Sequence, residues 1–214
     1  MKQTLVCFAV KEEMKFFKPV TGSQTLITGM GGRNADLAIR QALANRKPEL
    51  VLTCGFAGGL HPSLEANAIV FECDPGTRLE TVLTSVGARR CSFHFARRVA
   101  ITPSEKNELW KQTGMDAIEM ESQSIHNVCR EERVPCATVR VISDTAHESL
   151  PLDFNLLMNH QQKLNYGKLG ILLLKQPQKI GELMSFQKQT IAAAQHLGEF
   201  LNRFIPIVQN QQSI

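Results

Sequence analysis

The sequence has little excess charge and no long basic run. Its 214 residues include 24 Lys and Arg against 20 Asp and Glu, which gives a net charge of +4. The densest basic spots are the pairs Arg89-Arg90 and Arg97-Arg98, and short pairs of this kind usually belong to the solvated surface. A nucleic-acid-binding face needs a larger and more concentrated excess. We therefore expect no nucleic-acid partner.

Metal-binding and redox cysteine motifs are also missing. The six cysteines are Cys7, Cys54, Cys73, Cys91, Cys129 and Cys136. No two of them have the two-residue spacing of a zinc or redox motif. Several lie in apolar runs, where cysteine behaves as a small hydrophobic residue. We expect reduced, buried thiols, a cytoplasmic location, no metal site and no cofactor.

A secretory leader and a membrane span are not evident either. The chain starts directly with a strand-like run, without the basic segment, long apolar stretch and cleavage site of a signal peptide. The longest fully apolar run in the C-terminal half, residues 171–174, is far shorter than the roughly 20 residues that cross a bilayer. We expect no integral membrane segment.

The sequence does contain a regular alternation of strand-like and helix-like segments. Strands are expected at 4–10, 25–28, 49–53, 67–72, 80–84, 98–102, 115–120 and 136–142. Helices are expected from Glu12-Glu13, over 34–44, over 122–133 and through most of 152–205. This alternation predicts an α/β fold with a mixed, mostly parallel central sheet flanked by helices. With 43% hydrophobic residues, 1–214 is long enough for a single domain.

Two glycine-rich turns follow predicted strands. The first, Gly29–Asn34, invites comparison with a dinucleotide fingerprint, but its sixth position is Asn34 and no acidic residue follows at the usual distance. A dinucleotide-dependent oxidoreductase is therefore disfavoured. The turn fits equally a close approach to a ligand and a tight turn with positive φ. The second turn, Gly55–Gly59, favours the ligand, since two small-residue turns at one sheet edge leave room for it.

Acidic residues also follow predicted strands. Glu13 follows the first strand, Glu119 and Glu121 flank a methionine where the seventh ends, and Asp144 closes the last. Ligands of a parallel sheet bind outside the carboxyl ends of its strands, so these acids are candidates for one cleft. If the strand continues, Glu119 and Glu121 share a face. Asp144 has two interpretations, an N-cap of the next helix or a desolvated acid that protonates a leaving group.

Five motifs, in this order, resemble those of the nucleoside phosphorylase and nucleosidase superfamily, which includes methylthioadenosine/S-adenosylhomocysteine nucleosidase. They are Ala9–Glu13, Gly29–Gly31 with Asn34-Ala35, Gly55–Gly59, Glu119–Ser122 and Arg140–Asp144. Each motif is weak alone, but the ordered set is specific, and it covers the chain from about Leu5 to Asp144. The resemblance implies a nucleoside phosphorylase-like fold and cleavage of the N-glycosidic bond of a purine nucleoside.

The resemblance also implies residue roles. Asp144 matches the acid that protonates or hydrogen-bonds N7 of the leaving purine, and Glu13 matches the base that orients the attacking water. Glu121 matches the acid that grips the ribose 2′- and 3′-hydroxyls, with Met120 packed against the sugar. The remaining substrate-binding candidates are Gly31, Phe56, Ala57, Gly58 and Ser143. The alternatives are a helix-capping Asp144 and solvated Glu13 and Glu121.

Water is favoured over phosphate as the nucleophile. Phe56, close to Cys54, stands where the family often carries a hydroxyl residue near the nucleophile. The candidate phosphate ligands are Arg33 and Arg140, whereas a bound phosphate usually takes a bidentate arginine or several N–H groups. The alternatives are phosphorolysis, hydrolysis of methylthioadenosine or futalosine, and non-catalytic nucleoside binding.

A closer resemblance is to the hopanoid-associated subgroup of the family. Similar runs are Thr102–Lys106, Thr113-Gly114, Glu119–Ser122, Ser143–Ala146 and Leu150-Pro151. This resemblance implies release of adenine from adenosylhopane, an amphiphile with a bulky apolar tail that the helices of 152–204 would guide. The plainer interpretation of those helices is that they pack on the sheet. The superfamily also implies a homo-oligomer with partner residues entering the site.

Overall fold

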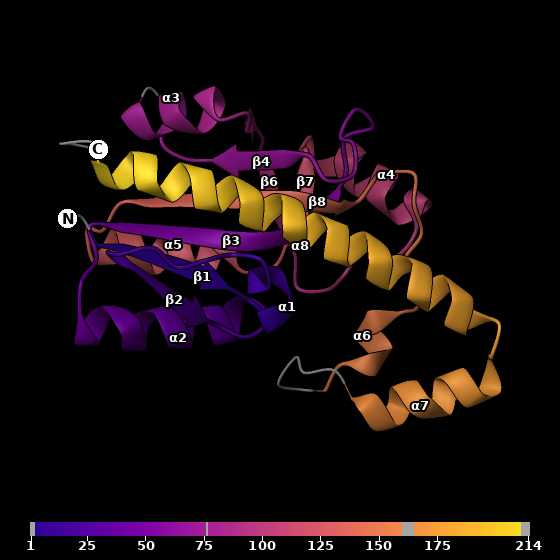
Figure 1. Cartoon of the computed structure of the whole chain (residues 1–214). Coiled ribbons are helices and arrows are strands. Elements are labelled where there is room, and N and C mark those ends of the chain that lie inside the picture. Colours follow the sequence, from indigo (N-terminus) through magenta and orange to yellow (C-terminus); the bar gives the residue numbers. More distant parts are fainter. Residues whose placement is uncertain (1–2, 76, 160–164, 211–214) are drawn as a thin grey trace.

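The computed structural model of the chain describes residues 3–75, 77–159 and 165–210, and these form one sheet with helices on both faces (Figure 1). The strands are β1 Thr4–Phe8, β2 Ser23–Ile27, β3 Leu50–Gly59, β4 Ile69–Glu72, β5 Arg89–Arg90, β6 Phe93–Phe95, β7 Ala117–Glu119 and β8 Cys136–Asp144. The helices are α1 Lys11–Met14, α2 Gly32–Asn45, α3 Arg78–Ser85, α4 Pro103–Thr113, α5 Ser122–Glu131, α6 Phe154–Leu157, α7 Tyr166–Lys175 and α8 Lys179–Asn210.

The sheet is mixed and mostly parallel, as predicted. Its main path runs β2-β1-β3-β8-β4-β5, with β7 paired to β3 and β6 paired to β7. Only two of these contacts are antiparallel among the described strands, β3 with β7 and β4 with β8. Strands β1, β3 and β8 run parallel side by side in the middle of the sheet, so their carboxyl ends meet at one edge.

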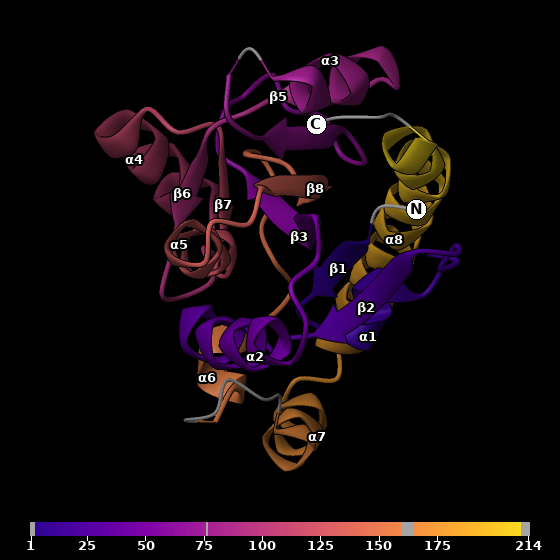
Figure 2. The same ribbon diagram turned by 90° about the vertical axis from the view of Figure 1, so that its left-hand side faces the viewer.

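The central strands are buried on both faces because helices cover each side (Figure 2). In β1, Val6 and Phe8 face a core that Phe200 and Phe204 of α8 complete. The alternate residues Leu5 and Cys7 face a second core beneath α2 and α5, with Ile39 and Ile125. This alternation is what the two-residue period of a strand requires. The two cores hold β1, β3 and β8 rigidly in register.

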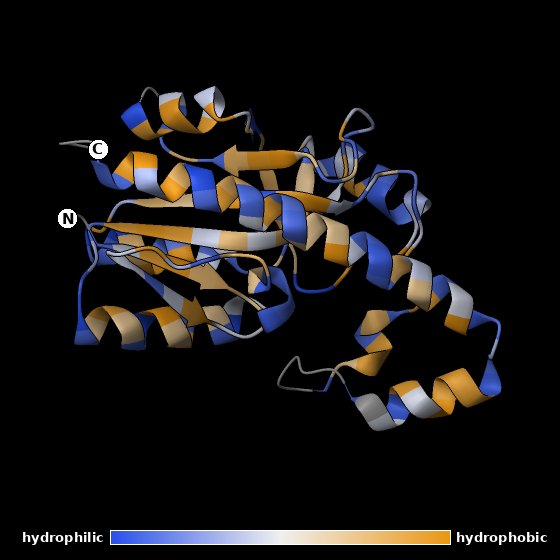
Figure 3. Cartoon of the chain, in the orientation of Figure 1, coloured by the Kyte–Doolittle hydropathy of each residue, from blue (hydrophilic) through white to orange (hydrophobic). Residues whose placement is uncertain are grey.

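Helix α8 has its buried residues in the second part of its length. Its buried residues begin at Ala193, and Gly198 crosses so close to α1 that a Cβ atom there would overlap the backbone of Phe16. The N-terminal half runs beyond the sheet to α7 (Figure 1). Helices α6 and α7 and the start of α8 contain exposed apolar residues. They include Leu156, Ile171, Leu174, Ile180 and Met184. Figure 3 shows hydrophobic residues, in orange, along α6 and α7 and at places along the start of α8.

Three local predictions are wrong. The segment 80–84 is helical, because Thr77 caps α3 by accepting the Glu80 N–H at 3.3 Å and Leu79, Val82 and Leu83 form its buried face. The segment 98–102 is not a strand, since it leads into α4. The second glycine-rich segment, Gly55–Gly59, is not a turn but the last half of β3, because β8 pairs with it up to Gly58 and β7 pairs with Gly58 and Gly59.

The cysteines and the basic pairs lie as the sequence predicts. All six cysteines are free thiols, and only Cys136 is partly exposed. The four arginines of the basic pairs at 89–90 and 97–98 are exposed. In the described part of the chain, no helix combines the length and the apolar character that crossing a membrane requires.

Candidate active site

Glu13 lies in α1, directly after β1, and its carboxylate contacts the middle of β3 at Gly55 and Phe56. Its Oε2 accepts the N–H groups of Ala9 and Val10 at 2.8 and 3.2 Å, and its Oε1 accepts that of Phe56 at 2.9 Å. The side chain is buried, so the alternative of a solvated Glu13 is wrong. Burial raises the pKa of this carboxyl, against the lowering effects of Arg140 and the three N–H groups. A carboxylate of raised pKa is a stronger base, which suits proton abstraction.

Arg140 of β8 is fully buried among carboxylates. Its Nη2 lies 2.6 Å from Glu119 Oε2, 3.6 Å from Glu121 Oε2 and 3.3 Å from Thr53 Oγ1. A Cβ atom at Gly55 would overlap both this guanidinium and the Glu13 carboxylate, so the two lie together over Gly55. Burial lowers the pKa of Arg140, but the neighbouring glutamates outweigh it and the net direction is upward. The positive charge of Arg140 therefore acts on three carboxylates, those of Glu13, Glu119 and Glu121.

Glu121 stands at the start of α5 and faces the first glycine-rich turn. Its Oε1 accepts the Gly31 N–H at 2.7 Å, so the anion at the start of α2 is the protein's own carboxylate. Gly31 has φ of 81°, which also confirms the tight turn. The side chain of Glu121 is buried, so its solvated alternative is wrong. Burial raises the pKa of Glu121 to about 7, with Arg140 opposing and Glu119 and Glu13 adding to the rise.

Glu119 supports the position of Glu121 at the start of α5. Its Oε2 accepts the N–H groups of Glu121 and Ser122 at 3.0 and 2.7 Å, and its Oε1 accepts the Ser122 hydroxyl at 2.7 Å. Together with the Arg140 contact, these bonds use most of its acceptor capacity. Glu119 therefore fixes the start of α5 and holds Glu121 in place.

Asp144 lies at the other end of the cluster, where β8 ends. Ser143 has no partner in the register, and this bulge between Ile142 and Asp144 re-aims the Asp144 side chain. The carboxylate accepts the Ser143 hydroxyl on Oδ1 at 2.6 Å and is buried. The capping interpretation is wrong, because the next helix starts at Phe154 and is capped by Asp153.

Lys106 also lies at the site, although our sequence analysis named it only within the run Thr102–Lys106 and assigned it no role. It is the one buried residue of α4, with no exposed surface. Its Nζ donates to Asp144 Oδ2 at 2.5 Å and to the backbone oxygens of Thr145 and Glu148 at 2.7 and 3.0 Å. All three ammonium protons therefore have acceptors. A buried lysine on a polar helix has no signal in composition or periodicity, because lysine is almost always solvent-exposed.

The two ends of the acidic cluster lie along strand β3. Glu13 and Arg140 lie over Gly55, and Asp144 lies beside Gly58, where its Oδ2 would be 3.3 Å from a Cβ atom. Three residues of strand span about 10 Å, which is close to the length of a nucleoside from its ribose hydroxyls to the far side of its base. The buried Ala57 and the half-buried Phe56 lie between these ends.

The other candidates take different places. Met120 is half-buried and lies between Glu119 and Glu121 in the sequence. Arg33 is exposed, so it is no part of the buried cluster. Burial raises the pKa of Cys54, which keeps its thiol neutral and unsuited to nucleophilic attack.

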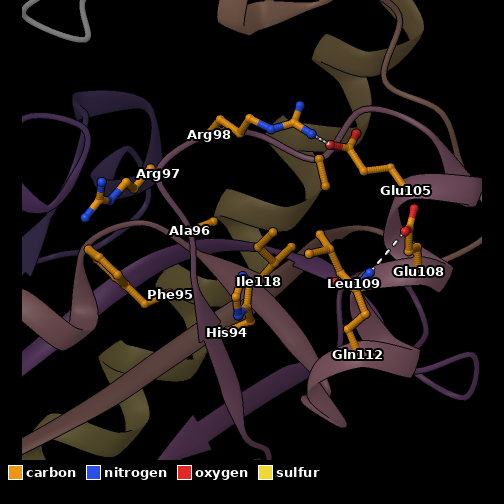
Figure 4. A pocket seen from close by; sticks show the side chains of 11 residues that line it. His94, Phe95, Ala96, Arg97, Arg98, Glu105, Glu108, Leu109, Gln112 and Ile118 are labelled. Carbon is orange, nitrogen blue, oxygen red and sulfur yellow. Dashed lines mark hydrogen bonds and ion pairs between the residues drawn. The ribbon is translucent and has the colours of Figure 1, made fainter.

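A pocket of about 490 Å³ adjoins the cluster (Figure 4). It is lined by His94 and Phe95 of β6, by residues 96–98 and Ala100 after that strand, by the α4 residues Glu105, Glu108, Leu109 and Gln112, and by Ile118. Ile118 also packs against Gly58, next to Asp144, and the Phe95 ring packs against Gly32 beside the first turn. Glu13, Glu121 and Asp144 are not among its walls. The pocket thus lies next to the carboxylate cluster, because Ile118 lines the pocket and also packs against Gly58 beside Asp144.

Known proteins share this sequence pattern and this fold. The sequence profile of the phosphorylase superfamily matches residues 81–167. The 5′-methylthioadenosine/S-adenosylhomocysteine nucleosidases of Bacillus thuringiensis (strain Al Hakam) and Bacillus cereus (strain AH187) are each 24% identical over 169 residues, 63% of this chain and 73% of theirs.

Solved structures extend the likeness to nearly the whole chain. Futalosine hydrolase of Helicobacter pylori strain 26695 has a TM-score of 0.69 at 17% identity, over 96% of this chain and 98% of its own. S-adenosylhomocysteine nucleosidase of Streptococcus pyogenes, in complex with 5-methylthiotubericidin, has a TM-score of 0.69 at 13% identity, over 97% of each chain. At these identities the structural likeness demonstrates a common fold.

Proposed function

Because this chain belongs to the nucleoside phosphorylase and nucleosidase superfamily, we propose that it is a nucleosidase, a hydrolase that cleaves the N-glycosidic bond of a purine nucleoside. The observation that carries the proposal is the arrangement of three buried acids along β3. Glu13, with Glu121 near the same Arg140, lies over Gly55 in the middle of β3, and Asp144 lies beside Gly58 near its carboxyl end, a separation that fits a nucleoside between them. A protein that merely binds nucleosides has no need of an acid at the leaving base.

The chemistry divides among these residues. Glu121 has one oxygen on Gly31 and keeps acceptor capacity for the ribose 2′- and 3′-hydroxyls. As the C1′–N bond breaks, its electron pair leaves with the base, and a proton delivered at Asp144 neutralises that base. A water molecule adds its oxygen to C1′ and gives its proton to Glu13, whose raised pKa makes it a competent base. The products are the free base and the free sugar.

The charges at the sugar end favour water over phosphate. Arg140 is shared by Glu13, Glu119 and Glu121, so this end carries a surplus of negative charge. The Gly31 N–H, which would otherwise serve an anion at the start of α2, is taken by Glu121. A phosphate dianion would meet repulsion here that a neutral water does not meet. Phosphorolysis is therefore the less favoured reaction.

We propose adenine as the base and adenosylhopane as the substrate. The chain leads from Asp144 directly into α6, α7 and the free half of α8, whose exposed apolar side chains fit an apolar tail better than water. The exposed residues Leu156, Ile171 and Leu174 are the ones we expect to contact that tail. Methylthioadenosine and futalosine are the alternatives, since nucleosidases of those names share the fold.

The proposal also covers the domain extent, the cellular location and the oligomeric state of the enzyme. We expect residues 1–214 to work as one nucleosidase-like domain, with the helical part at about 152–205 beside the site. Six free cysteines fit a reducing cytoplasm. The exposed apolar helices also fit a homo-oligomer, in which a partner copy completes the site.

A substrate panel tests the proposal. Purified protein is incubated with adenosine, methylthioadenosine, futalosine and adenosylhopane, and free base is quantified by chromatography. Release of adenine, fastest from adenosylhopane and abolished by Asp144→Asn, supports the full proposal. Faster cleavage of methylthioadenosine or futalosine removes the hopanoid assignment and keeps the nucleosidase. Binding of nucleosides without release of any base contradicts the enzymatic function.

A further inference from the structure

The ammonium of Lys106 is the one positive charge in contact with Asp144 among the described residues. It touches Oδ2 at 2.5 Å, while the Ser143 hydroxyl occupies Oδ1. Opposite charges at this distance inside a protein attract each other. Both carboxyl oxygens of Asp144 thus accept hydrogen bonds from the protein, and Lys106 Nζ carries the protons nearest to Oδ2.

A purely structural role accounts poorly for this lysine. Burying an ion pair costs desolvation that an apolar pair of similar volume avoids. Helix α4 is already well defined without it, because Thr102 caps its start, Pro103 occupies the first turn and Gly114 ends it in the left-handed conformation. In the loop after β8, the backbone carbonyls of Thr145 and Glu148 accept hydrogen bonds from the Lys106 ammonium. Gln189 of α8 donates to the Ser143 carbonyl and to the Glu148 carboxylate and so holds this loop in place. The site is built around the ammonium.

We propose that Lys106 is a positioning residue that supplies the proton of the leaving base through Asp144. This inference rests on the proposed nucleosidase function and deepens it. The proton moves from Lys106 Nζ to Asp144 Oδ2 and from that carboxyl to the base nitrogen, as the C1′–N bond breaks and its electron pair passes to the base. Lys106 is left as a neutral amine and Asp144 as a carboxylate. The proton that Glu13 takes from the attacking water then leaves to solvent, and solvent recharges Lys106.

Two substrates whose leaving groups differ in acidity distinguish proton supply by Lys106 from a purely structural role. An adenine nucleoside needs a proton at the departing base, whereas 4-nitrophenyl β-D-ribofuranoside loses a phenolate that needs none. We would measure kcat on both substrates for wild type, Lys106→Met and Lys106→Arg, with melting curves for each. Lys106→Arg keeps a cation against Asp144 and protects the fold, but a guanidinium stays protonated and cannot supply the proton. Lys111→Met, an exposed position on the same helix, is the matched control.

The expected result is a loss of at least about 100-fold in kcat on the adenine nucleoside for both Lys106 variants, the range that general acid catalysis contributes. Their kcat on the nitrophenyl riboside stays close to that of wild type, and Lys111→Met changes neither. Equal losses on both substrates, or full adenine release by Lys106→Arg, would overturn the relay and leave the nucleosidase standing. A wild-type protein that cleaves neither substrate would overturn the proposed function and the relay with it.

Discussion

Replacing Arg140 by methionine removes the only cation that Glu13, Glu119 and Glu121 share in the described structure. The guanidinium is 1% exposed, and its loss leaves the buried acids without a counter-charge, although their hydrogen bonds to N–H groups remain. Breaking a buried ion pair from one side costs about 3–5 kcal/mol. For a domain of this size each kcal/mol lowers Tm by roughly 2–4 °C, so we expect Arg140→Met to melt roughly 6–20 °C below wild type.

The same substitution changes the pH dependence of catalysis. Arg140 lowers the pKa of Glu13 and of Glu121, against the larger effect of burial. Its removal raises both pKa values further, so the carboxylates that bind ribose and activate water form only at higher pH. The acid limb of kcat/KM should move upward from about pH 7, the value at which Glu121 ionises.

Arg40→Met is the matched control for this prediction. Arg40 also pairs with two acids, Asp36 and Glu131, but its side chain is 45% exposed. Exposed ion pairs contribute about 0–1 kcal/mol, so Tm should change little and the pH profile not at all. Thermal melting and a pH series of kcat/KM check both variants. An Arg140 variant that melts with the Arg40 variant, and whose acid limb stays in place, would refute the electrostatic reasoning.

Three further substitutions test other parts of the site and the fold. Glu121→Gln should lower kcat/KM and abolish the limb near pH 7, because an amide does not titrate; a limb that persists in the pH series would assign it to another group. Gly31→Ala places a side chain at φ of 81°, so we expect a stability loss of about 1 kcal/mol or more and a raised KM, measured by denaturant unfolding and initial rates. Phe200→Ala should cost about 3–5 kcal/mol by unfolding while leaving the pH profile unchanged, and a shifted profile would show that the α8 core acts on the site.

The sequence indicates which acids lie near the central strands, while their catalytic roles stay a prediction. Glu13 follows β1 and Asp144 closes β8, and both strands pair in parallel with β3. Glu121 follows β7, which is antiparallel to β3, and it joins the cluster through Arg140. The fold class follows from the same alternation, because strand-turn-helix repeats have few stable solutions other than a covered, mostly parallel sheet.

The failures come from contacts that no local pattern contains. The β-branched residues of 80–84 suggest a strand, but Thr77 starts a helix there and its apolar residues pack as a helical face. Four small residues among the five at 55–59 suggest a turn, yet pairing with β8 up to Gly58 keeps the segment in β3, and Glu13 and Arg140 fit above Gly55. Lys106 meets Asp144 across 38 positions of sequence, and only the folded chain brings them together.

The central claim is that water, not phosphate, attacks the sugar. The most direct measurement is to run the cleavage in ¹⁸O-labelled water with phosphate present and to determine the mass of the sugar product by mass spectrometry. Hydrolysis by this site predicts a free sugar carrying one ¹⁸O at C1′, at a rate that phosphate does not change. A sugar 1-phosphate without the label, formed only when phosphate is added, would contradict the account.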